Sequence, residues 1–265
     1  MTTLYTLTRG DAPLVINIPH VGTWVPTELR PLMTPPALGV PDTDWHVDRL
    51  YDFARGLGVT LMAATHSRYV VDLNRDPEGG ILYPGASNTE LCPTGRFDGG
   101  PVWSEGSAGH PLLDVAARRR QYFDPYHAQL AAELQRVHAQ HGYVVLLDGH
   151  SIISRCERFF EGRLPDLNLG TADGASCAPA LQQAAVAALA TAPEFSHVVN
   201  GRFKGGWITR HYGQPQRGYH AVQLEMALEA YMTESEPYNW DPQRAAGLVR
   251  VLRTLVDALL AWRPE

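Results

Sequence analysis

The stretch YVVLLDGHS, residues 143–151, decides the fold that we expect for this chain. Its first five residues form the strongest strand pattern in the sequence, a continuous apolar run typical of a strand buried on both faces of a sheet. A polar segment follows at once and brings Asp148, His150 and Ser151 out of the end of that strand. The pattern therefore predicts a central strand with reactive side chains at its carboxyl end.

Shorter apolar runs alternate with helical patterns on either side of this stretch. The predicted strands cover 14–18, 59–64, 69–73, 197–200 and 220–224. The predicted helices cover 43–57, 178–191 and 242–262. A further predicted helix is capped by Asp124, and Pro125 breaks it from the segment before it. Such alternation implies an α/β fold, with a parallel or mixed sheet sandwiched between helices. Because 45% of the 265 residues are hydrophobic, one large core and a single domain over 1–265 are expected.

Composition excludes several classes of protein. A net charge of −6 argues against a nucleic-acid-binding surface, although a local arginine cluster could still bind an anionic small molecule. No stretch reaches the roughly 18 apolar residues that a membrane helix needs. The three cysteines form no CxxC pair, which argues against a disulfide framework and against a cysteine zinc site. We expect a cytoplasmic protein without membrane or nucleic-acid partners, and its oligomeric state stays open.

Reactive side chains fall at the ends of the predicted strands, which is where ligands bind in open α/β sheets. His20 in IPHVGTW and His150 in LLDGHS each follow a buried strand directly. Asp148 is placed to orient an imidazole through its second ring nitrogen. Glu225 in AVQLEM ends another apolar run, where a carboxylate is costly to bury unless it is paired or used. These residues are the first candidates for a functional site.

The segment PDTDWHVDRLY offers four possible metal ligands in seven residues, namely Asp42, Asp44, His46 and Asp48. A helix that begins here would also favour acidic residues without any metal, because its N-terminus carries partial positive charge. Two histidines, one carboxylate and a water molecule are a common ligand set for catalytic zinc. The segment therefore supplies the candidates for the carboxylate ligand and leaves the choice among them open.

The segment SRYVVDLNRDP places polar side chains within and around a predicted strand. Arg68, Asp72, Asn74 and Arg75 interrupt this apolar run, with Asp72 and Asn74 on one side of it. Arginine offers a planar fork to a carboxylate, so these arginines are candidates to bind an anion. Arg210, in KGGWITRHYG, follows a flexible glycine pair and could also reach a ligand. Residues 76–110 form a long loop, and long loops in compact domains are often functional.

These segments resemble the N-formylglutamate amidohydrolase family. IPHVGTW, DTDWHVDRLY, SRYVVDLNR, LLDGHS, GGWITRHYG and VQLEM occur in the family's order, and the resemblance spans about residues 12–260. The family is similar to zinc carboxypeptidases and aspartoacylase-like deacylases, which implies a phosphorylase/hydrolase-like three-layer α/β/α sandwich around a mixed sheet. It also implies the activity, which is hydrolysis of N-formyl-L-glutamate to L-glutamate and formate in histidine degradation.

The resemblance implies roles for individual residues. His20 and His150 match the metal ligands, Glu225 matches the general base, and Asn74 with Arg75 matches a substrate clamp. Zinc carboxypeptidases have a glutamate three residues after the first histidine, but Thr23 stands there in this chain. We therefore expect the carboxylate ligand from elsewhere and choose Asp44, with Asp48 or His46 as substitutes.

The expected cofactor is Zn²⁺ or a similar divalent metal, and the expected partner is a small anionic substrate. In this hypothesis Glu225 activates water for attack on the formyl carbon and then protonates the leaving amine, with Arg75 beside the carbonyl oxygen. Arg68, Arg210 and Asn74 are candidates to hold the two substrate carboxylates, while Asp72 and Asp148 support the metal ligands. Two alternatives stay open: a zinc hydrolase of another N-acyl amino acid or short peptide, and a non-catalytic protein that binds acidic amino acids.

Overall fold

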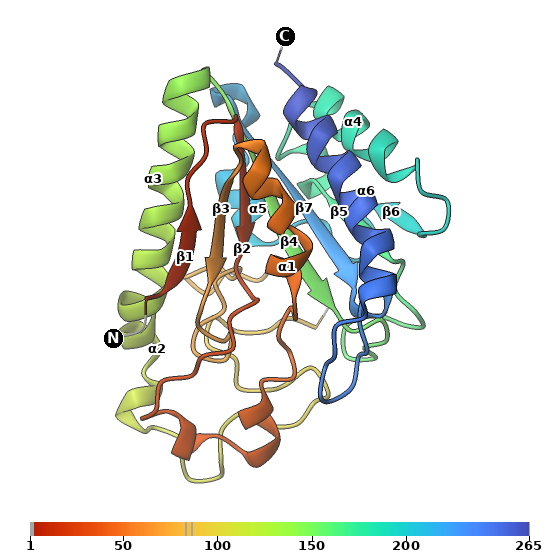
Figure 1. The fold of residues 1–265 in the computed structure, drawn as a ribbon. Helices are drawn as coiled ribbons and strands as arrows, with labels where there is room; N and C mark the ends of the chain where they lie inside the picture. The colour runs from red at the N-terminus through yellow and green to blue at the C-terminus, as the bar shows by residue number, and fades with distance from the viewer. Residues whose placement is uncertain (1–2, 83, 86, 265) are drawn as a thin grey trace.

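The structure, a computed structural model, describes residues 3–82, 84–85 and 87–264 (Figure 1). Within these residues, seven strands form one sheet in the order β1-β3-β2-β4-β7-β5-β6. Their bounds are β1 Tyr5–Thr8, β2 Leu14–Ile18, β3 Thr60–Ala64, β4 Val144–Ile152, β5 Leu167–Gly170, β6 His197–Val199 and β7 Tyr219–Ala227. The four central strands β3, β2, β4 and β7 are parallel, whereas β1 pairs antiparallel with β3 and β5 pairs antiparallel with β7. The last strand, β6, pairs parallel with β5. The sheet is therefore mixed, as predicted.

Helices cover both faces of the sheet (Figure 1). One layer holds α1 (Val47–Leu50), α4 (Pro179–Leu189) and α6 (Pro242–Ala261), and the other holds α3 (Asp124–His141) and α5 (Trp207–Tyr212). Short 3₁₀ helices lie at Arg30–Leu32, Pro35–Gly39, Asp52–Leu57, Pro111–Leu113, Ala172–Gly174, Pro215–Arg217 and Leu228–Ala230. The predicted three-layer α/β/α sandwich is confirmed.

Alternation along the central strands divides the core between the two faces. In β4, Val145 and Leu147 pack toward α4 and α6, whereas Val144 and Leu146 pack toward α3. This two-sided burial explains why the strand reads as a continuous apolar run. Among the helices that the structure describes, none combines the length and the apolar character that a membrane span requires.

The predicted strand at 69–73 is wrong. Its apolar residues are buried, but they belong to a turn that starts at Ser67, where the Val70 N–H bonds the Ser67 carbonyl. The backbone there pairs outside the sheet: the Asp72 N–H donates to the Leu91 carbonyl, and Arg118 donates to the carbonyl oxygens of 69 and 70. Burial beneath a loop therefore produced the same pattern as burial in a sheet.

Two helix boundaries also differ from the expectation. The predicted helix 43–57 is shortened to α1 and the 3₁₀ turn after it, because His46 has a left-handed conformation with φ of 61°. Pro125 does not separate α3 from the preceding helix α2 (Val115–Arg118), since a π-helical turn at Arg119–Phe123 joins them. The wider turn accommodates a proline that has no N–H to donate.

Candidate active site and metal centre

Polar side chains replace apolar ones toward the carboxyl ends of the central strands. On the face covered by α3, the row Val15, Leu146 and Ala221 is followed two residues later by Asn17, Asp148 and Gln223. The next residues on this face, His150 in β4 and Glu225 in β7, are paired in register. We expected both strands to end before these residues, but β4 continues to Ile152 and β7 to Ala227. The sheet itself therefore holds these side chains.

His20, Asp44 and His150 converge at this end of the sheet. Each can offer one ligand atom such that all three atoms lie within 4.8 Å of one another. The Asp44 Oδ2 atom lies 3.0 Å from His150 Nδ1 and 3.7 Å from His20 Nδ1. All three residues are at most 2% exposed, so the cluster is not an ordinary group of surface polar residues.

Carboxylates lie behind both imidazoles. His20 Nε2 is 2.8 Å from Asp72 Oδ1, and His150 Nε2 is 2.9 Å from Asp148 Oδ2. Each Nε2–H can donate to its carboxylate, which leaves each Nδ1 directed toward Asp44. A protonated ring donates from Nδ1 to Asp44, and a neutral ring offers the Nδ1 lone pair to a cation. Such carboxylate–histidine pairs fix the tautomer and the ring orientation of metal ligands. Asp148 is held in turn by Asn17, whose Nδ2 donates to Asp148 Oδ1 at 2.8 Å.

The surroundings of Asp44 fit a cation. Its backbone N–H donates to the His20 carbonyl oxygen, and the Ser151 N–H donates to its Oδ2 at 3.1 Å. Its other oxygen, Oδ1, is buried and makes no hydrogen bond to any described residue, although Arg68 Nη1 is 3.5 Å away. Two imidazole nitrogens and a carboxylate with an unsatisfied buried oxygen are a suitable donor set for a divalent ion such as zinc.

The substitutes considered for Asp44 lie elsewhere. His46 Nε2 is 2.9 Å from the Tyr238 carbonyl oxygen, and Asp48 is exposed. The left-handed backbone at His46 turns the chain, so that Asp44 is directed to the buried cluster. We therefore keep Asp44 as the proposed carboxylate ligand.

The pKa values of the carboxylates in the site are shifted in opposite directions. Burial alone would raise the pKa of Asp44, but hydrogen bonds from His150 and His20 outweigh it and lower that pKa. Burial also opposes ionisation of Asp72, yet the charges of Arg75, His20 and Arg68 hold its pKa well below the usual range. At Glu225, by contrast, burial raises the pKa to about 8, and the nearby Asp44 carboxylate adds to the rise while His150 opposes it. Glu225 is thus the carboxyl of the site that most readily holds a proton.

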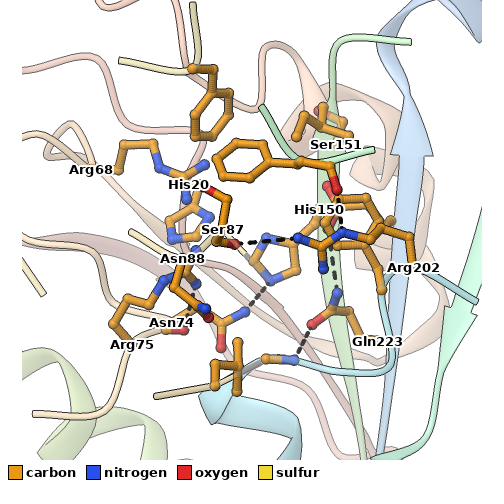
Figure 2. Close-up of a pocket in the computed structure, with 17 residues that line it drawn as sticks. His20, Arg68, Asn74, Arg75, Ser87, Asn88, His150, Ser151, Arg202 and Gln223 are labelled. Atoms are coloured by element: carbon orange, nitrogen blue, oxygen red, sulfur yellow. Dashed lines mark hydrogen bonds between the residues drawn. The ribbon is translucent and has the colours of Figure 1, made fainter. Parts of the chain in front are cut away.

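A cavity opens in front of this cluster (Figure 2). Arg68, Arg75 and Arg202 supply cationic groups to its wall, and Glu225 faces it together with His20. The remaining lining residues are Asn74, Leu82, Ser87, Asn88, Phe97, His150, Ser151, Ile152, Phe159, Phe203, Gly206 and Gln223. Residues 82, 87, 88 and 97 of the long loop line this cavity, while residues 83 and 86 lie outside the described part of the chain.

The predicted anion-binding residues differ in how their polar groups are used. Arg68 is buried and donates to Asp72 Oδ2 at 2.7 Å, so its charge is already paired with a carboxylate of the site. Arg75 donates from Nε to the Thr89 carbonyl and hydroxyl oxygens, and its Nη2 is 4.0 Å from Asp72 Oδ2. Asn74 is held by protein groups at both ends of its amide, which favours a positioning role.

Arg210 lies outside this cavity. It borders a different hollow, formed with Ala172, Ala175, Ser176 and Gly213, and its Nε donates to the Gly205 carbonyl at 2.9 Å. Arg210 belongs to helix α5, and its side chain is exposed. The expectation that Arg210 holds substrate carboxylates is therefore not supported by its position.

Arg202 and Gln223 line the cavity but were not predicted. Gln223 could have been found, because it stands two residues before Glu225 and therefore on the same face of a strand. Arg202 lies in the loop after β6, and no local pattern distinguishes it from a surface arginine.

Comparisons with known proteins identify the family of this chain. The sequence profile of the N-formylglutamate amidohydrolase family matches residues 12–232. An N-formylglutamate deformylase of Pseudomonas putida is 46% identical over 261 residues, which cover 97% of this chain and 96% of the relative. One from Pseudomonas aeruginosa is 48% identical over 258 residues, with the same coverage.

The chain belongs to the N-formylglutamate amidohydrolase family. A solved member of the family, an N-formylglutamate amidohydrolase from Ralstonia eutropha, has a similar structure, with a TM-score of 0.76 at 27% identity and coverage of 96% of this chain and 97% of that one. A gene product of Agrobacterium tumefaciens shares the fold, with a TM-score of 0.72 at 18% identity and coverage of 97% and 93%. The family membership and the fold predicted from the sequence are thereby confirmed.

Proposed function

We propose that this chain is a metal-dependent N-formylglutamate deformylase, which hydrolyses N-formyl-L-glutamate to L-glutamate and formate. The observation that carries the proposal is the convergence of His20, Asp44 and His150 at a cavity that also contains Glu225 and three arginines. The names of the two Pseudomonas relatives support the choice of substrate.

His20 and His150, through Nδ1, and Asp44 would hold Zn²⁺ or a similar divalent ion. When bound, such an ion polarises a carbonyl oxygen and lowers the pKa of water from 15.7 to about 7. Asp72 and Asp148 keep the two imidazoles oriented and make them more basic as metal ligands.

Glu225 is the proposed general base and acid. It accepts a proton from the water that attacks the formyl carbon and holds that proton until the amine leaves. It then delivers the proton to the amide nitrogen, because an amine anion is too basic to leave at neutral pH. The carbon–nitrogen bond breaks, and formate and the free amino group result.

Cationic groups in the cavity wall would bind the two carboxylates of the substrate. Arg75 and Arg202 are the candidates, since both line the cavity and a guanidinium can form paired hydrogen bonds with a carboxylate. Arg68 contributes positive charge while it remains bound to Asp72.

On this proposal the enzyme acts in the cytoplasm, in histidine degradation. The free and buried state of Cys92, Cys156 and Cys177 agrees with a reducing compartment.

Formate release tests the proposal. The purified protein should release formate from N-formyl-L-glutamate, lose this activity after chelation, and regain it with Zn²⁺. N-acetyl- and N-succinyl-glutamate should be poor substrates. Preference for either of them would indicate a different acyl hydrolase, and binding of substrate without any turnover in the presence of metal would indicate a binding protein.

A further inference from the structure

Gln223 lies beside the proposed general base, and its amide is held in one orientation. The Gly206 N–H donates to Gln223 Oε1 at 2.7 Å, so this end of the amide must be the oxygen. The nitrogen is thereby turned toward Glu225, and Nε2 donates to Glu225 Oε2 at 3.3 Å (Figure 2). Gln223 is 2% exposed, which leaves its amide little room to rotate away.

A second amide is held from the same segment in the same way. The Ile208 N–H donates to Asn74 Oδ1 at 2.7 Å, and Asn74 Nδ2 is then turned toward Asp148 Oδ2 at 3.3 Å and His150 Nε2 at 2.9 Å. Two backbone N–H groups, of Gly206 and Ile208, thus fix two amide side chains whose nitrogens face carboxylates of the site. The repeated arrangement indicates that the orientation of these donors matters to the site.

We propose that Gln223 is a positioning residue that determines which oxygen of Glu225 carries the transferred proton; this inference rests on the proposed function. A hydrogen bond from an amide N–H occupies one of the two lone pairs of Oε2 and makes this oxygen the less basic of the pair. The bond therefore favours Oε1 as the oxygen that takes and delivers the proton. The bond also holds the carboxylate in one rotamer against repulsion from Asp44 and Asp148. Without it, Glu225 still carries its charge but meets water and amine in the productive geometry for a smaller fraction of the time.

Two variants separate this role from a structural one. Gln223→Met removes both hydrogen bonds at a similar side-chain length. Gln223→Glu keeps an oxygen for the Gly206 N–H but replaces the donor that faces Glu225. We expect both to lower kcat for N-formyl-L-glutamate by about 10- to 100-fold, with KM changed less than about threefold and metal content unchanged. Gln182→Met, in α4 away from the cavity, is the matched control and should behave as the wild type.

Three outcomes would overturn the inference. A near-normal kcat in Gln223→Glu would mean that Gln223 only anchors the segment at Gly206. A raised KM with normal kcat would make it a substrate contact. An undiminished effect of Gln223→Met on the residual turnover of Glu225→Gln would show that it does not act through Glu225. If the wild-type enzyme releases no formate, the proposed function fails and this inference fails with it. If the wild type releases formate but the Gln223 variants give one of these three outcomes, this inference alone fails.

Discussion

His150 and Glu225 are direct register partners on the adjacent parallel strands β4 and β7. A proposed metal ligand and the proposed general base are therefore held by neighbouring backbones inside one sheet. Parallel neighbours in register direct their side chains to the same face, so their separation is fixed by the sheet. This rigid placement makes the roles of the two residues separable by mutation.

Replacing Glu225 by glutamine should remove catalysis without removing metal. The amide keeps the shape of the side chain but cannot accept the proton from water, so kcat should fall by about 10²–10⁴-fold. Metal content, measured by elemental analysis, should remain near one ion per chain. Turnover close to that of the wild type would exclude Glu225 as the base.

Replacing Asp44 by asparagine, or His150 by alanine, should release the metal. Each loses one of three protein ligands, and the buried cluster offers no described replacement. His46→Gln is the matched control, since His46 contacts the Tyr238 carbonyl instead of the cluster. Equal metal loss in this control, or full occupancy in His150→Ala, would contradict the ligand assignment.

Glu225 should also make the metal-free protein less stable as pH rises. Its folded-state pKa of about 8 lies above the ordinary value of 4.5, so the folded state binds the proton more tightly than the unfolded state does. Its contribution is fully present below about pH 4.5 and is lost as pH rises toward 8. Glu225→Gln mimics the protonated form and should therefore gain stability over the wild type with rising pH.

The gain at pH 8.5 should be on the order of 2–4 kcal/mol, compared with little at pH 4.5. Thermal unfolding of both proteins in chelator measures it as a difference in Tm. A difference that is constant across this range would show that Glu225 titrates normally.

Gly206→Ala should disturb the site through Asn74. An added Cβ would lie 2.3 Å from Asn74 Nδ2, so the amide must shift from its present contacts with Asp148 and His150. We expect kcat to fall at least about tenfold. Gly56→Ala is the control, because a Cβ at Gly56 meets no atom within 4 Å. Normal kinetics in Gly206→Ala would show that this contact relaxes without cost to the site.

Arg202→Gln should weaken the binding of N-formyl-L-glutamate. We expect KM to rise about tenfold or more, equivalent to one charge-assisted hydrogen bond. N-formyl-L-norvaline, which has a methyl group in place of the distal carboxylate, distinguishes the two substrate carboxylates. If Arg202 binds the distal one, the variant should handle this analogue as the wild type does.

Arg210→Gln is the control for that variant, because Arg210 lies outside the cavity. A larger rise of KM in Arg210→Gln than in Arg202→Gln would restore the original expectation for Arg210.

The sequence alone indicated the layered fold and several residues of the candidate site. Continuous apolar runs marked β2, β4 and part of β7, because burial on both faces leaves a local pattern. His20, His150 and Glu225 stood out because polar side chains interrupt or follow those runs. Their proximity could be inferred, since parallel strands bring their carboxyl ends to one edge. Short strands such as β1 and β5, with four residues each, gave no comparable pattern.

Only the tertiary structure decided which of several similar residues reach the site. Asp44 bonds His150, 106 positions away, whereas His46 contacts Tyr238, 192 positions away. Arg202 reaches the cavity and Arg210 does not, although neither has a distinctive local pattern. Local periodicity reports burial along one segment of chain. The direction of a loop side chain depends on distant backbone partners, which no nearby residue encodes.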